Sequence, residues 1–230
     1  WYKDQAVIMR VGVVILGPTI FGQILLKMLN QNGIHPDIVL LETGSERARK
    51  IKRWLIPKND PDPTIDINGR QNVTIVNDLF SKESRQTLKS RDLDYIINGG
   101  AGLFDEHYLS LALKCFLNVH PGLLPDFRGL DPVLWALYEK KPIGVTIHQI
   151  DNGIDTGDVL ISSQLPKQSG YRSLYELRIE CMRYGINQLI SFLNSPNSFK
   201  PKKQPVGAFP CRGKFPEDRM ESLVKLMNES

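Results

Sequence analysis

The N-terminal part of this chain restricts its fold more than any other stretch of the sequence. Arg10–Leu16 reads RVGVVIL, a continuous run of aliphatic residues that is typical of a strand buried on both faces. Apolar residues then recur at helical spacing as far as Gly33, a residue type that suits a helix end. Ile38–Leu41 is a second strand-like run. This order predicts the β-α-β opening of a doubly wound sheet.

The turn after the first strand does not carry a dinucleotide-binding fingerprint. That fingerprint requires G-x-G-x-x-G, whereas Gly17–Gly22 reads GPTIFG and lacks the middle glycine. We therefore interpret the turn as structural and do not expect a nicotinamide dinucleotide.

The remaining chain predicts further strands and helices in an α/β fold with a Rossmann-like, mostly parallel sheet. The strands are expected at Asn72–Val76, Asp94–Asn98, Phe116–Val119, Gly144–Gln149 and Asp158–Gln164. The helices are expected at Glu46–Leu55, from Ser81 onward, and at Asp105–Leu113, Asp131–Glu139, Ser173–Leu193 and Arg219–Met227. Pro57–Asn72, rich in Pro, Asp and Asn, is expected to be a surface loop. Residues 1–193 are then the main domain, and the proline-rich residues 194–230 form a short C-terminal arm, a candidate dimer element.

Composition is that of a soluble globular protein, with 41% hydrophobic and 23% charged residues. No apolar run approaches a membrane span, and no signal peptide is evident. Trp1–Ile8 could precede a natural start at Met9. The net charge of +4 is small and no basic stripe is interleaved with aromatic residues, so nucleic-acid binding is not expected. The basic run Ser45–Arg53 is either a solvated helix face or a surface that attracts an anionic substrate.

The cysteines give no sign of a disulfide framework or a metal site. Cys115, Cys181 and Cys211 are odd in number and widely spaced. We expect a reducing, cytoplasmic setting and no bound metal.

The candidate chemistry lies between positions 115 and 160. Asn118 and His120 are two apart on a strand and share a face, and Pro121 ends the strand at once. Open α/β sheets place their ligands at such carboxyl ends. The amide can donate to a developing oxyanion and the imidazole can carry a proton. Asp155, between two glycines, could approach His120, hold its charged form and so raise its pKa.

The same residues have plain structural interpretations, which the pattern alone leaves open. A histidine at a strand end is often a packing residue, and Asp or Asn before Gly is a common turn former. Asp151 and Asp158 compete with Asp155 for a carboxylate role.

The motifs in this stretch resemble those of the formyltransferases that use 10-formyltetrahydrofolate. The resemblance rests on Asn118–Pro125 (NVHPGLLP), Arg128-Gly129, Thr146–His148 and Asp155–Gly157, in order and spacing. It implies the formyltransferase fold, a catalytic triad of Asn118, His120 and Asp155, and N10-formyltetrahydrofolate as co-substrate. His148 matches a further family histidine whose role, structural or catalytic, stays open.

The resemblance also implies where the two substrates bind. The pterin ring is expected against backbone-lined segments, and the residues concerned are Ile97, Gly99, Gly100, Gly102, Leu103, Gln149, Ile150 and Asp151. Arg128, Gly129 and Trp135 are expected to contact the acceptor, although Trp135 would serve equally well as a core-facing residue.

The acceptor amine is the least determined part of the hypothesis. The purine-synthesis branch of the family carries a Gly- and Ser-rich phosphate loop after the first strand, which is not found at positions 16–21. The methionyl-tRNA branch carries a further C-terminal domain, for which few residues follow position 193. We therefore expect a nucleotide-linked 4-amino-4,6-dideoxy sugar used in surface polysaccharide such as O-antigen, and a homodimer without nucleic-acid or membrane partners. The alternatives are phosphoribosylglycinamide formyltransferase and a non-catalytic binding protein on the same fold.

Overall fold

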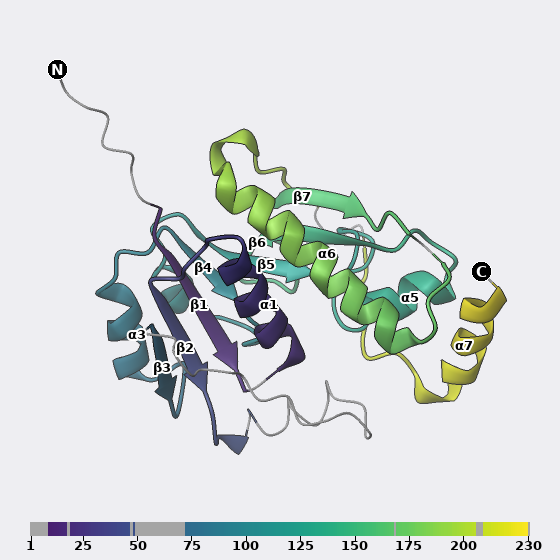
Figure 1. Ribbon diagram of the computed structural model, residues 1–230, viewed down its shortest axis with the longest axis horizontal. Helices are drawn as coiled ribbons and strands as arrows, with labels where there is room; N and C mark the ends of the chain where they lie inside the picture. Colours follow the sequence, from purple (N-terminus) through teal and green to yellow (C-terminus); the bar gives the residue numbers. More distant parts are fainter. Residues whose placement is uncertain are drawn as a thin grey trace. The chain divides into compact units, whose positions relative to one another are not determined.

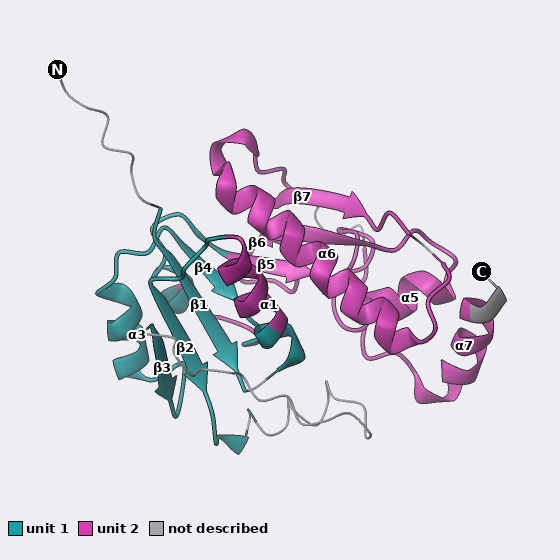
Figure 2. Cartoon of the chain, viewed as in Figure 1, with its two compact units in different colours: residues 1–23, 33–102, 107–116 teal, residues 24–32, 103–106, 117–230 magenta. Residues whose placement is uncertain are grey.

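The computed structural model describes residues 9–17, 19–46, 48, 72–167, 169–205 and 209–229. The chain divides into two compact units, the first made of residues 1–23, 33–102 and 107–116 and the second of residues 24–32, 103–106 and 117–230 (Figure 2). All of the expected loop at Pro57–Asn72 except Asn72, and most of the expected helix at Glu46–Leu55, lie outside the described residues.

The first unit contains a parallel sheet, as the opening of the sequence predicts. The strands are β1 (Val11–Leu16), β2 (Ile38–Glu42), β3 (Val73–Val76) and β4 (Tyr95–Asn98). They lie in the order β3-β2-β1-β4, and Val13 pairs with Val39 on one side and Ile97 on the other (Figure 1). Every residue of β1, β2 and β4 is buried, which explains the apolar runs that make up β1 and that precede Glu42 in β2 and Asn98 in β4.

The helices that begin in or belong to this unit are α1 (Ile20–Gln31), α3 (Lys82–Lys89) and α4 (Glu106–Leu109). Ser81 caps α3 by accepting a hydrogen bond of 3.1 Å from the N–H of Ser84, which confirms the predicted start. The expectation that α4 runs to Leu113 is wrong. Leu113 and Lys114 donate their N–H groups to Leu93 O and Asp94 O, so the chain has already left helical geometry there.

The second unit contains three antiparallel strands and the longest helix. The elements are β5 (Cys115–His120, which starts in the first unit), β6 (Gly144–Gln149), β7 (Val159–Gln164), α5 (Pro132–Tyr138), α6 (Leu174–Asn194) and α7 (Met220–Glu229). Asn118 pairs with His148 and His120 with Thr146 across β5 and β6. The register between β6 and β7 shifts at Ile147/His148.

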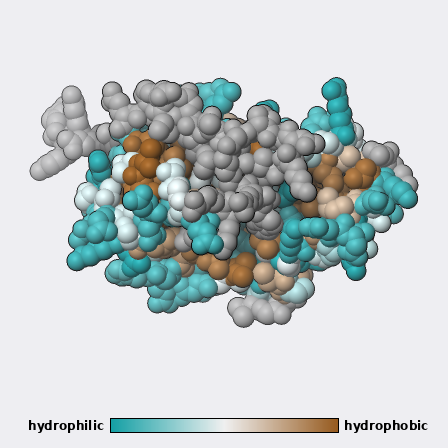
Figure 3. Space-filling model, turned by 90° about the horizontal axis from the view of Figure 1, so that it is seen from below, coloured by the Kyte–Doolittle hydropathy of each residue, from teal (hydrophilic) through white to brown (hydrophobic). Residues whose placement is uncertain are grey.

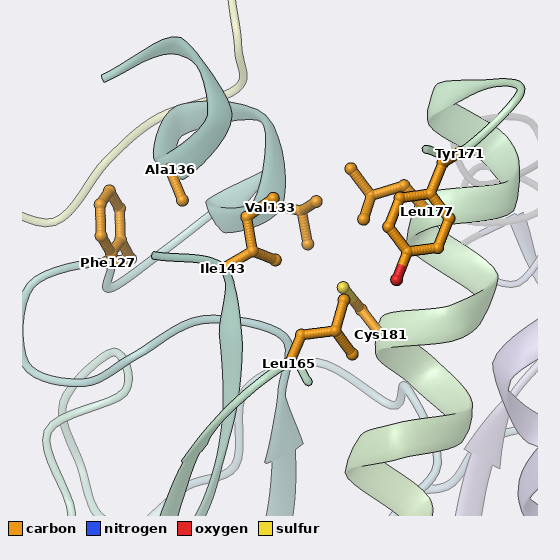
Figure 4. Close-up of a cluster of buried hydrophobic side chains, with 8 residues drawn as sticks. All are labelled: Phe127, Val133, Ala136, Ile143, Leu165, Tyr171, Leu177 and Cys181. Atoms are coloured by element: carbon orange, nitrogen blue, oxygen red, sulfur yellow. The ribbon is translucent and has the colours of Figure 1, made fainter. Parts of the chain in front are cut away.

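The core of this unit lies between α5, α6 and the start of β6. Figure 4 draws the cluster, which comprises Phe127, Val133, Ala136, Ile143, Leu165, Tyr171, Leu177 and Cys181. Gly185 brings α6 close to the strands, because an added Cβ there would lie 2.6 Å from Cγ1 of Val119. Val119 separates Asn118 from His120 along β5, so α6 packs directly behind the candidate site.

The C-terminal arm packs onto the same unit. A second apolar cluster joins Leu134 of α5 to Phe215 and to Leu223 of α7. Nearer the start of the arm, Lys202 exchanges two backbone hydrogen bonds of 2.8 Å with Val159 of β7. The predicted boundary at residue 193 and the predicted dimer contact of residues 194–230 both stay predictions.

Among the described residues, no helix is both long enough and apolar enough to cross a membrane. In the face drawn in Figure 3, hydrophilic and hydrophobic residues alternate in small patches over the described part of the surface. Burial raises the pKa of the Cys115 and Cys181 thiols to about 12, so neither is a ready nucleophile at neutral pH.

Candidate active site

Asn118 and His120 lie on one face of β5, as their spacing predicts. Both side chains reach the same carboxylate, that of Asp155. The amide nitrogen of Asn118 lies 3.5 Å from Asp155 Oδ1, and Nδ1 of His120 lies 3.5 Å from Asp155 Oδ2. The structure therefore brings together the three residues that the sequence singles out, all within the second unit.

Asp155 lies on a constrained loop between β6 and β7. Its φ of 53° is left-handed, a conformation that costs a non-glycine residue free energy. Asp151 stabilises the loop from inside, since its Oδ1 accepts hydrogen bonds from Gly153 N–H (3.0 Å) and Thr156 Oγ1 (2.6 Å). At the end of the loop, Gln149 donates its N–H to Asp158 O across 2.9 Å. Of the three aspartates that compete in the sequence, Asp155 is the one beside His120.

The hydrogen bonds of His120 determine where its proton resides. Nε2 lies 2.6 Å from the carbonyl oxygen of Phe127, and at that distance the ring nitrogen must carry the hydrogen. The lone pair of the neutral ring is then on Nδ1, which faces Asp155. A second proton on this ring would arrive at Nδ1 and form an ion pair with the carboxylate.

His148 fixes the amide of Asn118. Its Nδ1 lies 2.7 Å from its neighbour's carbonyl, Gln149 O, which places the ring hydrogen on Nδ1. Nε2 therefore presents a lone pair, and Asn118 Nδ2 lies 3.1 Å from it. The amide consequently turns its NH2 group toward His148 and Asp155, so a donor faces the interior of the site.

Burial changes both titrating groups. It lowers the pKa of His120, and it outweighs the nearby Asp155 charge, which acts in the opposite direction. Asp155 acts in the direction that the sequence predicts, but that prediction left out the cost of burying the ring, so the pKa of His120 is lowered overall. Burial is also the largest single influence on Asp155 and would raise its pKa. The neighbouring His148 and His120 side chains and the Gly129 N–H together lower the pKa of Asp155 to about 2.

The residues expected to hold folate occur in two groups. Ile97, Gly99, Gly100 and Gly102 follow or end β4 in the first unit, where Asn98 Oδ1 accepts hydrogen bonds from Gly100 N–H (3.0 Å) and Ala101 N–H (2.7 Å). Packing favours glycine at position 99, since an added Cβ would lie 2.6 Å from Cγ1 of Ile15. Gly100 and Gly102 have positive φ, so both positions favour glycine for their backbone.

The second folate group belongs to the other unit. Leu103 is exposed, Gln149 and Ile150 are partly exposed, and Asp151 is exposed. Folate binding by either group stays a prediction.

The three residues expected to contact the acceptor are held by the protein itself. Arg128 is buried, and its Nη2 donates to Gln204 Oε1 across 3.0 Å. The indole nitrogen of Trp135 donates to Gly213 O across 3.0 Å. Gly129 donates its N–H to Asp155 Oδ2 across 2.9 Å. These contacts describe the protein alone, and acceptor binding by the three residues stays a prediction.

Sequence reasoning missed three residues that hold the site together: Phe127, Gln204 and Arg212. Arg212 donates its backbone N–H to Arg128 O across 2.9 Å. Phe127 acts through its backbone carbonyl, which no side-chain pattern reveals. Gln204 and Arg212 come from the proline-rich arm and approach the site across more than forty residues of intervening sequence. Within the described residues, no group of three His, Cys, Asp or Glu side chains is arranged to hold a metal ion.

Comparison with known proteins identifies relatives over most of the chain. A family model described as formyl transferase matches residues 9–172. The methionyl-tRNA formyltransferase of Helicobacter acinonychis is 30% identical over 197 residues, which are 84% of this chain and 63% of that protein. The same enzyme of Pelagibacter ubique is 32% identical over 151 residues, 64% of this chain and 47% of that protein. The chain thus spans less than two thirds of the length of these curated relatives.

Solved structures of low sequence identity share the fold. A 4-N formyltransferase from Francisella tularensis has a TM-score of 0.60 at 20% identity, covering 88% of this chain and 76% of that one. The formyltransferase PseJ from Anoxybacillus kamchatkensis, in complex with UDP-4,6-dideoxy-4-formamido-L-AltNAc and tetrahydrofolate, has a TM-score of 0.56 at 20% identity and covers 93% and 90%. The phosphoribosylglycinamide formyltransferase from Anaplasma phagocytophilum has a TM-score of 0.60 at 18% identity and covers 89% and 99%.

Proposed function

This chain belongs to the formyl transferase family, and on that premise we propose that it transfers a formyl group from N10-formyltetrahydrofolate to a primary amine. The observation that carries the proposal is the meeting of Asn118, His120 and Asp155 at the end of β5. An amide donor, a proton carrier and a carboxylate within hydrogen-bond or ion-pair reach are the groups that acyl transfer to an amine requires.

In the proposed reaction, the amine nitrogen attacks the formyl carbon and a tetrahedral intermediate forms. The Nδ2–H of Asn118 donates to the oxyanion of that intermediate, for which it leaves its contact with His148 or Asp155. The intermediate then collapses, and the bond between the formyl carbon and N10 breaks. The products are the N-formyl amine and tetrahydrofolate.

The proton that the amine loses must reach N10, and His120 is the proposed carrier. The depressed pKa leaves the ring neutral and able to accept a proton at Nδ1. Asp155, which stays ionised, stabilises the imidazolium that results. His120 then gives this proton to N10 as the bond breaks, so the protein is unchanged after the cycle.

We propose a nucleotide-linked 4-amino-4,6-dideoxy sugar as the acceptor. The sequence Arg128-Gly129-Leu130-Asp131, followed by Trp135, resembles that of the nucleotide-sugar branch of the family, and this resemblance supports the choice. The Anoxybacillus enzyme, whose complex contains a formamido sugar nucleotide, shares the fold over most of both chains. Methionyl-tRNA is the competing acceptor, because both curated relatives described above are methionyl-tRNA formyltransferases.

The test is a direct assay with N10-formyltetrahydrofolate and three acceptors. These are a dTDP-linked 4-amino-4,6-dideoxyhexose, methionyl-tRNA and glycinamide ribonucleotide. Tetrahydrofolate release is followed by absorbance, and the product is identified by a mass increase of one formyl group. We expect turnover with the sugar nucleotide. Turnover with only methionyl-tRNA or only glycinamide ribonucleotide would show that this compound, and not the sugar nucleotide, is the acceptor. No turnover with any of the amines would contradict formyl transfer.

A further inference from the structure

We propose that Gln204, in the C-terminal arm, is a positioning residue that holds Asp155 in place for the reaction. The inference rests on the proposed function for its catalytic consequence. Its structural part, the hold on the Asp155 loop, can be tested without any acceptor.

The side-chain amide of Gln204 uses both of its ends. Nε2 donates to two backbone carbonyls of the Asp155 loop, Asp155 O at 3.0 Å and Gly157 O at 2.7 Å. Oε1 accepts from Arg128, with Nε at 3.3 Å and Nη2 at 3.0 Å. Gln204 is buried, so these bonds form away from competing water.

The two bonds from Nε2 act where the backbone needs support. Asp155 has a φ of 53°, and residues in that conformation persist only when surrounding contacts determine it. Gln204 donates hydrogen bonds to the carbonyl of Asp155 itself and to that of Gly157, two residues later. Gly129 holds the carboxylate at the other end through its N–H. Backbone and side chain of Asp155 are thus fixed by different segments.

Arg128 determines which way the amide faces. A guanidinium has donors and no acceptor, so only Oε1 of Gln204 can face it. Nε2 must then point at the two carbonyls. A glutamate at position 204 would pair with Arg128 but would turn a carboxylate oxygen toward two carbonyl oxygens, losing both donors to the loop.

The backbone around Gln204 is itself anchored. Two positions earlier, Lys202 exchanges backbone hydrogen bonds with Val159 of β7. The carbonyl of Pro205 is 3.5 Å from Arg128 Nη2. Val159 lies just after the Asp155 loop. The arm is therefore hydrogen-bonded both to the loop, through Gln204, and to the strand that follows it, through Lys202.

The experiment compares Gln204→Glu with Gln164→Glu, a matched change at an exposed position of β7. Steady-state kinetics give kcat and KM, and NMR of the ring of His120 gives its titration as a function of pH. For Gln204→Glu we expect kcat to fall about 10- to 100-fold with KM for the acceptor changed little, as small displacements of catalytic groups produce. The pKa of His120 should fall as well, because Asp155 moves away from Nδ1. Gln164→Glu should match the wild type in both measurements.

A folded Gln204→Glu protein with wild-type kcat and a wild-type His120 titration would overturn the proposal. A lower melting temperature without a change in the titration would assign Gln204 to stability alone and would also overturn it. If Gln204→Glu does not fold, Gln204→Met takes its place, because it keeps the length of the side chain and removes the amide that donates to the loop; unchanged kcat and titration there overturn the proposal. If no acceptor is found, the proposed function fails. A lowered pKa of His120 in Gln204→Glu would still support the proposal that Gln204 positions Asp155.

Discussion

The backbone N–H of Gly129 donates to Oδ2 of Asp155 across 2.9 Å. Gly129 can take this position because of a close crossing of two segments. Its φ is +96°, and an added Cβ would lie 2.2 Å from the carbonyl oxygen of Arg212. That carbonyl also accepts the N–H of Leu130 at 2.9 Å. The orientation of the carboxylate thus depends on a glycine that lets the C-terminal arm pass.

Gly129→Ala should therefore impair both stability and activity. The alanine has to adopt a strained φ and push away the backbone of Arg212, so we expect a loss of about 2 to 4 kcal/mol in the free energy of unfolding. Loss of the N–H contact should lower kcat further. Urea unfolding and steady-state kinetics measure the two effects. Gly213→Ala is the control, because nothing lies within 4 Å of the Cβ added there. Equal stability of the two variants would mean that the crossing is not tight.

Removing the charge of Asp155 should shift the pH dependence of the reaction. That charge raises the pKa of His120, although burial outweighs it. Asp155→Asn should lower the pKa of His120 further and move the acid limb of kcat/KM to lower pH. The rate should fall about 10²- to 10⁴-fold, the range that acid–base groups contribute. Asp158→Asn is the matched control from the same sequence segment. If the acid limb of kcat/KM for Asp155→Asn stays at the wild-type pH, Asp155 does not influence the group that carries the proton.

Asn118→Ala and His120→Ala should each reduce turnover while the protein stays folded. Loss of one oxyanion donor costs about 10²- to 10³-fold in kcat, and loss of the proton carrier costs a similar amount or more. Circular dichroism and the melting temperature establish that the fold persists. A near-wild-type rate in either variant would remove that residue from the mechanism.

His148→Leu tests whether the ring orients Asn118. The leucine fills a similar volume but accepts no hydrogen bond, so the amide of Asn118 loses the contact at 3.1 Å that selects its orientation. We expect kcat to fall about tenfold, less than in Asn118→Ala, since the donor remains present in part of the population. In the double variant His148→Leu/Asn118→Ala, the loss from the first change should largely disappear. Fully additive losses would assign His148 an effect independent of Asn118.

The strands and the shared face of Asn118 and His120 could be predicted from local pattern, whereas the choice of Asp155 as their partner rested on the resemblance to the formyltransferases. β1 is a buried apolar run, and Asn118 and His120 share a face through the two-residue period of a strand. The pKa of His120 could not be predicted, since it depends on how completely the ring is buried. The role of Gln204 could not be predicted either. It contacts Asp155 from a proline-rich segment 49 residues away, where no periodicity reveals a partner.

Both titrating groups of the site should make the protein less stable in acid. The unfolded chain protonates this histidine near pH 6.5 whereas folded His120 resists protonation, so its contribution is complete above pH 6.5 and is lost as the pH falls toward the lowered pKa. Asp155 acts at lower pH, because its pKa is about 2 in the folded state and 3.8 without perturbation. That difference of about two units corresponds to about 2 to 3 kcal/mol, present above pH 4 and lost toward pH 2.

Urea midpoints at pH 7.5, 5.5, 4 and 3 measure these two contributions. His120→Asn should weaken the dependence of stability on pH below 6.5, because no imidazole remains to be protonated on unfolding. Asp155→Asn should reduce the additional loss between pH 4 and 3. Asp158→Asn, a change of the same kind at the end of the same loop, should keep the wild-type profile. If His120→Asn loses stability with falling pH as steeply as the wild type does, His120 is not the group that resists protonation in the folded protein.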